Sequence, residues 1–174
     1  MFLTLYHGSD VEIKKFDPKF FNTGTNNQEL GTGFYFTDSK DLASSYGKYI
    51  HECKVRIGKK LDVNKLGTLH PQTISFIIRN APNYKETLEN FGEIDREGYF
   101  NVLNTAIEAY SNVGKISTGL FNLENDFYDG YEYRFNQVVY RTRLGINCIY
   151  EQRADMIYNI FFPEQIKLLR IFEI

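Results

Sequence analysis

The hydrophobic and polar positions of this chain follow a strand pattern near both ends and a helix pattern in the middle. Residues 51–57 alternate strictly, with Cys53, Val55 and Ile57 on one face and charged side chains on the other. This alternation is typical of a half-solvated strand. Short apolar runs bounded by turn residues predict the remaining strands. We expect strands at residues 2–6 and 33–36, a hairpin formed by 146–152 and 156–162, and a terminal strand after Pro163.

Helical spacing appears between these strands. Asp38 and Ser39 are good N-cap residues, and they precede a segment whose apolar side chains fall on one helical face, which predicts a short helix at residues 40–46. The middle of the chain has apolar residues at helical intervals over longer stretches. We expect helices there at about 71–79, 84–91, 99–111 and 131–143. Residues 14–30 contain Pro, Gly and several Asn, and this composition predicts a long irregular loop.

Together these elements predict an α+β fold, in which a split β-sheet is interrupted by a helical block at about 64–143. The 174 residues are 43% hydrophobic, enough for one well-packed core. No internal repeat or low-complexity linker divides the sequence. We therefore expect residues 1–174 to form a single domain.

The charge and cysteine content narrow the class of protein. The formal net charge is -2 and the sequence pI is about 5.9, so the chain as a whole lacks the charge of a nucleic-acid or membrane binder. No apolar run approaches the roughly 18 residues of a membrane-spanning helix. Cys53 and Cys148 have no spacing that suggests a metal site, and a domain of this size needs no disulfide. These features predict a cytoplasmic protein without metal.

Three short motifs carry the candidate chemistry. They are "YHGS" at residues 6–9, "GTGFYFTDS" at 31–39, and Tyr46 eleven residues after Tyr35. Each is weak alone, but in this order the set resembles the ADP-ribosyltransferase superfamily, on the branch shared by diphtheria toxin and the poly-ADP-ribose polymerases. Within it, the chain is most similar to the small ADP-ribosyltransferases of phages and bacterial conflict systems. "ECKVRIGKKLDV" and "YNIFFPEQIK" extend the resemblance to about residues 3–63 and 144–172.

The resemblance implies a site that binds NAD as substrate. His7 matches the residue that bonds a hydroxyl of the adenosine ribose, and Ser9 is a further ribose contact. Gly8 matches the position whose backbone holds the nicotinamide carboxamide. Tyr35 and Tyr46 match the two rings that sandwich the nicotinamide, and Tyr35 is thereby also assigned to the catalytic set.

The position of the family's catalytic glutamate departs from the pattern. Counted back from Gln165, that position holds Ile157. One explanation is that the third position really is isoleucine, as in some mono-ADP-ribosyltransferases, and that the acceptor brings its own base. This would favour single transfer over polymer formation.

The other explanation places a polar group from the hairpin beside Ile157. If residues 153–154 form a two-residue tip, Gln152 pairs with Asp155, and either can supply that catalytic group. Glu151 then points to the opposite face, although a one-residue slip would exchange the faces. The residues expected to share one face are Tyr150, Gln152, Asp155, Ile157 and Asn159.

Other polar residues receive no function from the sequence. His51 and His70 have no partners in the pattern, and we assign them no role. The arginines at 134, 141, 143 and 153 are interpreted as a solvated charged face.

The resemblance implies transfer of ADP-ribose from NAD to a macromolecule, either a protein or a nucleic acid such as single-stranded RNA. It also suggests a toxin or effector of a bacterial or phage conflict system, with an antitoxin or inhibitor protein as partner. Two other functions remain open. One is an NAD glycohydrolase, which uses water as acceptor, and the other is an inactive NAD-binding module.

Overall fold

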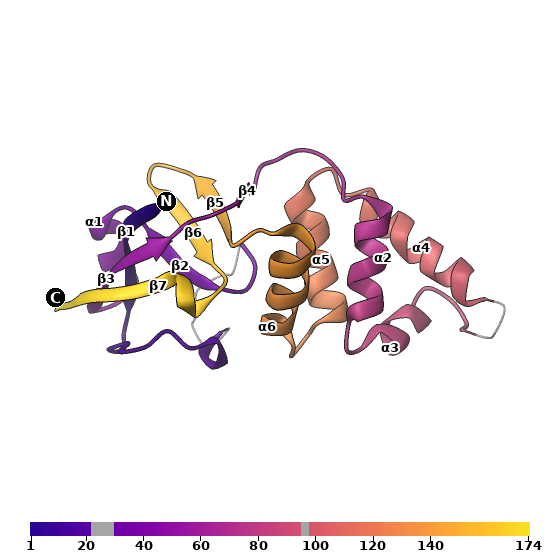
Figure 1. The fold of residues 1–174 in the computed structure, drawn as a ribbon, viewed down its shortest axis with the longest axis horizontal. Helices are drawn as coiled ribbons and strands as arrows, with labels where there is room; N and C mark the ends of the chain where they lie inside the picture. Colours follow the sequence, from indigo (N-terminus) through magenta and orange to yellow (C-terminus); the bar gives the residue numbers. More distant parts are fainter. Residues whose placement is uncertain (22–29, 95–97) are drawn as a thin grey trace. The chain divides into compact units, whose positions relative to one another are not determined.

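A computed structural model describes residues 1–21, 30–94 and 98–174 of the chain. The chain divides into two compact units, which are described separately. The first contains Met1–Asp62 and Gly145–Ile174, and the second contains Val63–Leu144 (Figure 1). The second unit coincides with the helical block predicted at about 64–143. That residues 1–174 form one domain stays a prediction.

The first unit is built on a sheet with the strand order β4-β5-β6-β2-β1-β3-β7. Neighbouring strands are antiparallel, apart from the parallel pair β4–β5. The strands are β1 Phe2–Ser9, β2 Phe34–Thr37, β3 Tyr49–Arg56, β4 Lys60–Asp62, β5 Cys148–Gln152, β6 Met156–Ile160 and β7 Ile166–Glu173. The predicted α+β class is confirmed, and β4 is an addition to the predicted strands.

One face of this sheet carries a hydrophobic core. Leu5, Phe36, Val55 and Ile160 come from four different strands and are at most 1% exposed. Phe16 enters the same cluster from the loop after β1. Full burial of such a side chain contributes roughly 1.5–3 kcal/mol. The core therefore fixes which face of each strand points inward.

The alternation of faces predicted for residues 51–57 is kept in β3, because its pairing with β1 runs without interruption from Arg56 to Tyr49. The register shift opposite Glu52 and Cys53 is a β-bulge in the partner strand β7, where Leu169 is the extra residue between Leu168 and Arg170. Glu52 therefore points away from Cys53, as predicted, but the assignment of its side chain to solvent is wrong. It is only 8% exposed, and its carboxylate lies 2.8 Å from the Arg170 guanidinium on β7.

Short helical segments complete the first unit. The helix α1, Lys40–Ser44, confirms the predicted helix and is capped by Ser39, whose Oγ accepts a hydrogen bond from the Leu42 backbone at 3.1 Å. The 3₁₀ turns are η1 Pro18–Phe20 and η3 Pro163–Gln165. The irregular loop predicted for residues 14–30 falls partly on residues 22–29, which lie outside the described residues.

The second unit is helical. Its elements are α2 Pro71–Asn80, α3 Tyr84–Glu89, α4 Tyr99–Ser111, α5 Ile116–Phe127, α6 Glu132–Phe135 and the π-helical η2 Asn136–Leu144. The sequence pattern missed α5. Its Gly119 disfavours a helix, but a Cβ there would lie only 3.1 Å from the Leu69 side chain, so close packing favours glycine. Among the described residues, no helix is long and apolar enough to span a membrane.

Candidate active site

Gly8 lies where the end of β1 meets α1. A Cβ added at Gly8 would lie 1.9 Å from the Ala43 carbonyl oxygen and 2.9 Å from the Tyr46 Cβ. Only glycine therefore permits this approach without a shift of the backbone. The Tyr46 side chain begins beside Gly8 and is 43% exposed. The structure thus brings together two of the residues predicted to hold the nicotinamide.

The hydroxyl of Ser9, the next residue, is hydrogen-bonded within its own turn. Its Oγ accepts a hydrogen bond from the Val11 backbone N–H at 3.2 Å, which closes a turn at the end of β1. The predicted contact of Ser9 with a ribose stays a prediction.

His7 is linked to Tyr35 through the backbone. The Nδ1–H of His7 donates to the Tyr35 carbonyl oxygen at 2.7 Å. Its ring packs against Phe16 and Phe36, with centroid distances of 5.4 and 5.6 Å. Desolvation by burial lowers the pKa of His7 from 6.5 to about 4, against a smaller opposing effect of the Tyr35 hydrogen bond. The imidazole is therefore neutral at pH 7, and its Nε2 is an acceptor suited to a hydroxyl group.

His51, to which the sequence analysis assigned no role, is bonded to the backbone of His7. It faces His7 in the β1–β3 register and is fully buried. Its Nδ1–H donates to the His7 carbonyl at 3.1 Å, while its Nε2 accepts from the Ile13 backbone at 2.8 Å. Desolvation lowers the pKa of His51. His51 therefore connects the backbone of the predicted site strand to the following loop.

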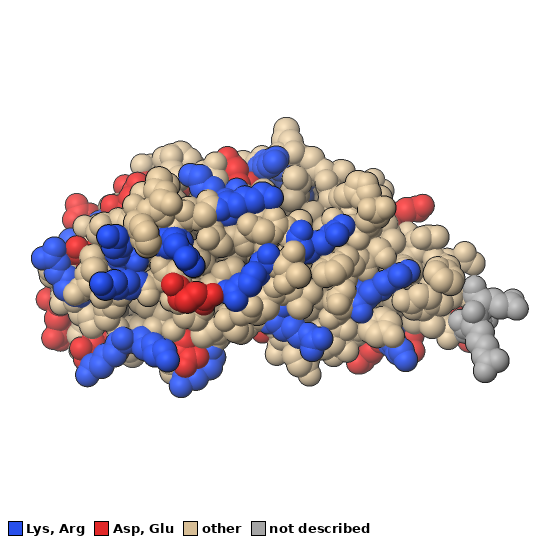
Figure 2. All heavy atoms as spheres, viewed as in Figure 1, with Lys and Arg blue, Asp and Glu red and all other residues tan. Residues whose placement is uncertain are grey.

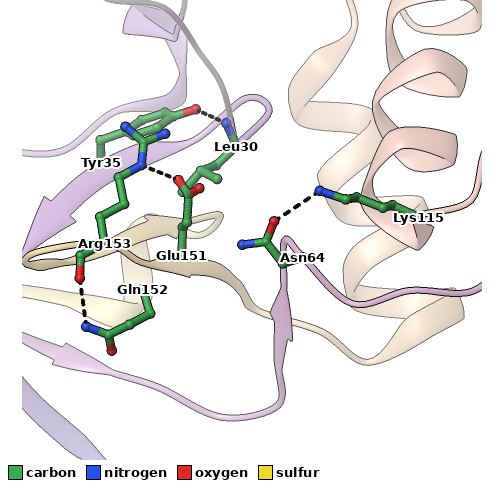
Figure 3. A network of polar contacts seen from close by, with 7 residues as sticks. All are labelled: Leu30, Tyr35, Asn64, Lys115, Glu151, Gln152 and Arg153. Carbon is green, nitrogen blue, oxygen red and sulfur yellow. Dashed lines mark hydrogen bonds and ion pairs between the residues drawn. The ribbon is translucent and has the colours of Figure 1, made fainter.

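The Tyr35 ring is held by its hydroxyl group. The hydroxyl accepts from the Leu30 backbone N–H at 2.9 Å (Figure 3). It also donates to the Gly31 carbonyl at 2.8 Å. Asn159, opposite Tyr35 on β6, donates its amide to the Leu30 and Gly31 carbonyls at 2.7 and 2.9 Å. Because the same short segment is bonded by both side chains, the orientation of the ring is fixed before any ligand binds.

The register of the β5–β6 hairpin differs from the prediction. Glu151 pairs with Ile157 and Gln152 with Met156, so the loop contains residues 153–155. The predicted pairs of Gln152 with Asp155 and of Tyr150 with Ile157 are wrong. The one-residue difference turns Gln152 away from the face of Ile157.

Asp155 lies in the hairpin loop, where its carbonyl accepts from the Arg153 backbone N–H at 3.2 Å. A catalytic role for Asp155 is therefore no longer supported by the register from which it was inferred. The sequence alone could not distinguish a two-residue loop from a three-residue loop, because both are common in hairpins.

The observed register puts Glu151 on the face of Tyr35. Thr37, Ile157 and Glu151 are successive cross-strand neighbours on β2, β6 and β5, and Tyr35 and Asn159 form the adjacent row. Directly paired residues of antiparallel strands share a face. In Figure 3 the Glu151 carboxylate points to the side on which Tyr35 lies, whereas Gln152 points away.

An ion pair holds Glu151. Its Oε2 lies 2.6 Å from Nε of Arg153, and the two side chains are 19% and 53% exposed, respectively. Sequence reasoning had placed Arg153 in a solvated charged strip.

Neither cysteine is suited to act as a nucleophile. Cys53 and Cys148 are fully buried, and desolvation raises the pKa of each thiol to about 12. Within the described ranges, no cluster of three or more His, Cys, Asp or Glu side chains is arranged to hold a metal ion.

The junction of β1, β2 and α1 therefore combines Gly8 packed against Tyr46 with a neutral His7 whose ring is bonded to the Tyr35 backbone. A carboxylate, that of Glu151, lies two strands from Tyr35. The family model described as "ADP-Ribosyltransferase in polyvalent proteins" matches residues 1–170. Among solved structures, an anti-CRISPR protein is similar at 16% sequence identity, with a TM-score of 0.40 over 100% of this chain and 96% of that one. The comparison with curated proteins found no match. The family match covers almost the whole chain, which therefore belongs to the ADP-ribosyltransferases of polyvalent proteins and is an ADP-ribosyltransferase, a family that uses NAD as substrate.

Proposed function

We propose that this enzyme is a mono-ADP-ribosyltransferase that transfers ADP-ribose from NAD to a macromolecule. The observation that carries the proposal is the junction of β1, β2 and α1, where His7 bonds the Tyr35 carbonyl and Gly8 lies against Tyr46. These residues match the family's NAD contacts one by one.

The chemistry of NAD fits these groups. The oxidised nicotinamide ring is a flat cation, so each aromatic face can contribute roughly 0.5–2 kcal/mol. Two rings alone cannot give tight binding, because 1.4 kcal/mol is about a factor of ten in affinity. Hydrogen bonds from the Gly8 backbone to the carboxamide and from a ribose hydroxyl to His7 supply the remainder.

In the reaction, the bond between nicotinamide and its ribose breaks, and the bonding electrons leave with neutral nicotinamide. A nucleophile of the acceptor then forms a bond to the same ribose carbon and loses its proton. The sugar is positively charged in the transition state, so nearby negative charge lowers the barrier. With Ile157 at the usual acidic position, we assign single transfer to this enzyme rather than polymer formation.

A groove in the helical unit supports a nucleic acid as one candidate acceptor. It has a volume of about 500 Å³ and is lined by Pro71, Gln72, Ser75, Phe76, Arg79, Asn80, Ile107 and Arg143. The Arg143 guanidinium lies over the Phe76 ring, 5.4 Å from its centroid. Arginine beside an aromatic ring suits a phosphate and an unstacked base, as found in single-stranded RNA or DNA.

The charges on the surface outside this groove do not favour one class of acceptor over another. In Figure 2, Lys and Arg side chains are spread over the visible face with Asp and Glu groups among them. A nucleic-acid acceptor would therefore be recognised by a local site rather than by the net charge of -2. A protein acceptor is the alternative.

The biological role proposed here is that of a toxin or effector in conflict between bacteria and phages, controlled by an antitoxin or inhibitor protein. The motif resemblance supports this role. Induced expression of the parent chain in a bacterial host should stop growth, whereas the Tyr35→Ala variant should not. Equal growth with both variants would contradict it.

The experiment that tests the function uses purified protein, NAD labelled in its adenylate group, and a cell lysate. Label should appear in macromolecules and be removed by nuclease, or by protease if the acceptor is a protein. Free labelled ADP-ribose without labelled macromolecule would identify an NAD glycohydrolase. NAD binding without nicotinamide release would identify an inactive module, and either outcome would refute the proposal.

A further inference from the structure

We propose that Glu151 on β5 is the catalytic carboxylate of this enzyme: from the neighbouring strand it stabilises the positive charge of the sugar, which its family does from the position of Ile157, while the acceptor brings its own base. The inference rests on the proposed function, because it assigns a residue to the same NAD-cleaving reaction.

The strand register carries the argument. Ile157 on β6 is directly opposite Glu151 on β5 and Thr37 on β2. Side chains paired in this way have Cβ atoms about 5 Å apart and point to the same face. A glutamate at residue 151 is therefore displaced by one strand from the expected position, without a change of face. Its long, flexible side chain can compensate for this displacement.

The other polar side chains of this face are neutral. The Asn159 amide donates to two backbone carbonyls, and the residue is fully buried. The Thr37 hydroxyl accepts from the Ser39 backbone N–H at 3.1 Å. Among the face-sharing residues of β2, β5 and β6, Glu151 is the one with a carboxylate. Of these side chains, it alone can supply negative charge to an oxocarbenium-like sugar.

The ion pair with Arg153 suits Glu151 to this role. The contact is made by Oε2, and the side chains of the arginine and the glutamate are 53% and 19% exposed, respectively. Because the arginine lies largely in solvent, its attraction to the carboxylate is weaker than in a buried pair, so a bound substrate can displace the arginine. Arg153 is thus a positioning residue, which orients the carboxylate before NAD arrives.

The first test replaces Glu151 with glutamine in the full chain. Nicotinamide release should fall by at least about a hundredfold, while NAD affinity changes only a few-fold. The matched control is Glu173→Gln, which removes the same charge. Glu173 lies on the edge strand β7, far along the strand order from β5, and its Oε1 is also in an ion pair, 3.6 Å from the Lys48 Nζ. The activity of this control variant should equal that of the parent. Thermal unfolding of both variants verifies that they are folded.

The second test moves the acid across the ladder. The double variant Glu151→Ile with Ile157→Glu should release nicotinamide at least about tenfold faster than the single variant Glu151→Ile, because the two positions face each other. If the double variant is no more active than Glu151→Ile, an acid at residue 157 cannot replace one at residue 151, and the proposed exchange of roles between these positions is wrong.

The possible failures are distinct. If the parent releases nicotinamide and Glu151→Gln does too, the assignment of Glu151 is overturned while the function stands. Loss of activity in Asp155→Asn with an active Glu151→Gln would assign the role to Asp155 instead. If the parent releases no nicotinamide with any acceptor, the proposed function itself fails.

Discussion

Burial of a neutral His7 makes the stability of the fold sensitive to acid. Its imidazole has a pKa of about 4 in the folded chain, against an ordinary value of 6.5. Above pH 6.5 the ring is neutral in both states and contributes no pH dependence. Between pH 6.5 and 4 the unfolded chain binds a proton that the folded chain does not, so stability falls as the pH falls. Below about pH 4 both states are protonated and the loss is constant.

The size of this effect follows from the same two values. Each pH unit in the interval corresponds to about 1.4 kcal/mol, so the full loss approaches about 3 kcal/mol. Solvent reaching the partly exposed ring reduces this to about 2 kcal/mol. Burial also lowers the pKa of His51, so the effect of His7 must be isolated with a variant.

The assay compares urea unfolding of the parent and of His7→Asn between pH 8 and 4. The variant lacks the titrating ring, so the difference in unfolding free energy between the two proteins should change by about 2 kcal/mol as the pH falls from 6.5 to 4. Nuclear magnetic resonance gives the direct check, since the ring proton of His7 should titrate near pH 4. A midpoint near 6.5, with a constant difference in stability, would refute a desolvated, neutral His7.

Three further predictions concern close packing and buried polar groups. Gly8→Ala should destabilise the fold by about 1–3 kcal/mol in urea unfolding and abolish nicotinamide release, because its Cβ would meet the Ala43 carbonyl at 1.9 Å; unchanged stability would contradict the contact. Asn159→Asp should cost about 3 kcal/mol or more at pH 7, since a buried carboxylate would face two carbonyl oxygens. This cost should shrink at low pH as the acid is protonated, and a pH-independent cost would count against it. Cys53 and Cys148, with pKa values of about 12, should react with a thiol reagent at pH 8 only after unfolding, and rapid modification of the native protein would disprove their burial.

The sequence predicted most of the elements because their patterns are local. The helix at α4 matches residues 99–111 since its apolar side chains recur at helical spacing over its whole length. The helix α5 was missed because Gly119 and neighbouring polar residues have low helix propensity. Tertiary packing overrides that preference, and Leu120 and Leu123 are fully buried.

In the candidate site, too, the residues in local motifs could be predicted, whereas the contacts that depend on strand pairing could not. His7, Gly8, Tyr35 and Tyr46 could be proposed as site residues because they lie in recognisable motifs, and their contacts with NAD stay predictions. The hairpin register could not be predicted, because one extra loop residue exchanges the faces of a strand without changing its apolar pattern. The His51 side chain bonds the backbone carbonyl of His7 on the neighbouring strand. A backbone partner of this kind cannot be identified from a single sequence.

The central claim is that this chain transfers ADP-ribose rather than only binding or hydrolysing NAD. The most direct measurement counts, in one reaction with adenylate-labelled NAD and lysate, the nicotinamide released and the label bound to macromolecules. We predict nearly equal amounts of the two products from the parent chain, and little of either from Tyr35→Ala. Nicotinamide accompanied only by free ADP-ribose, or equal activity in the Tyr35→Ala variant, would contradict the account.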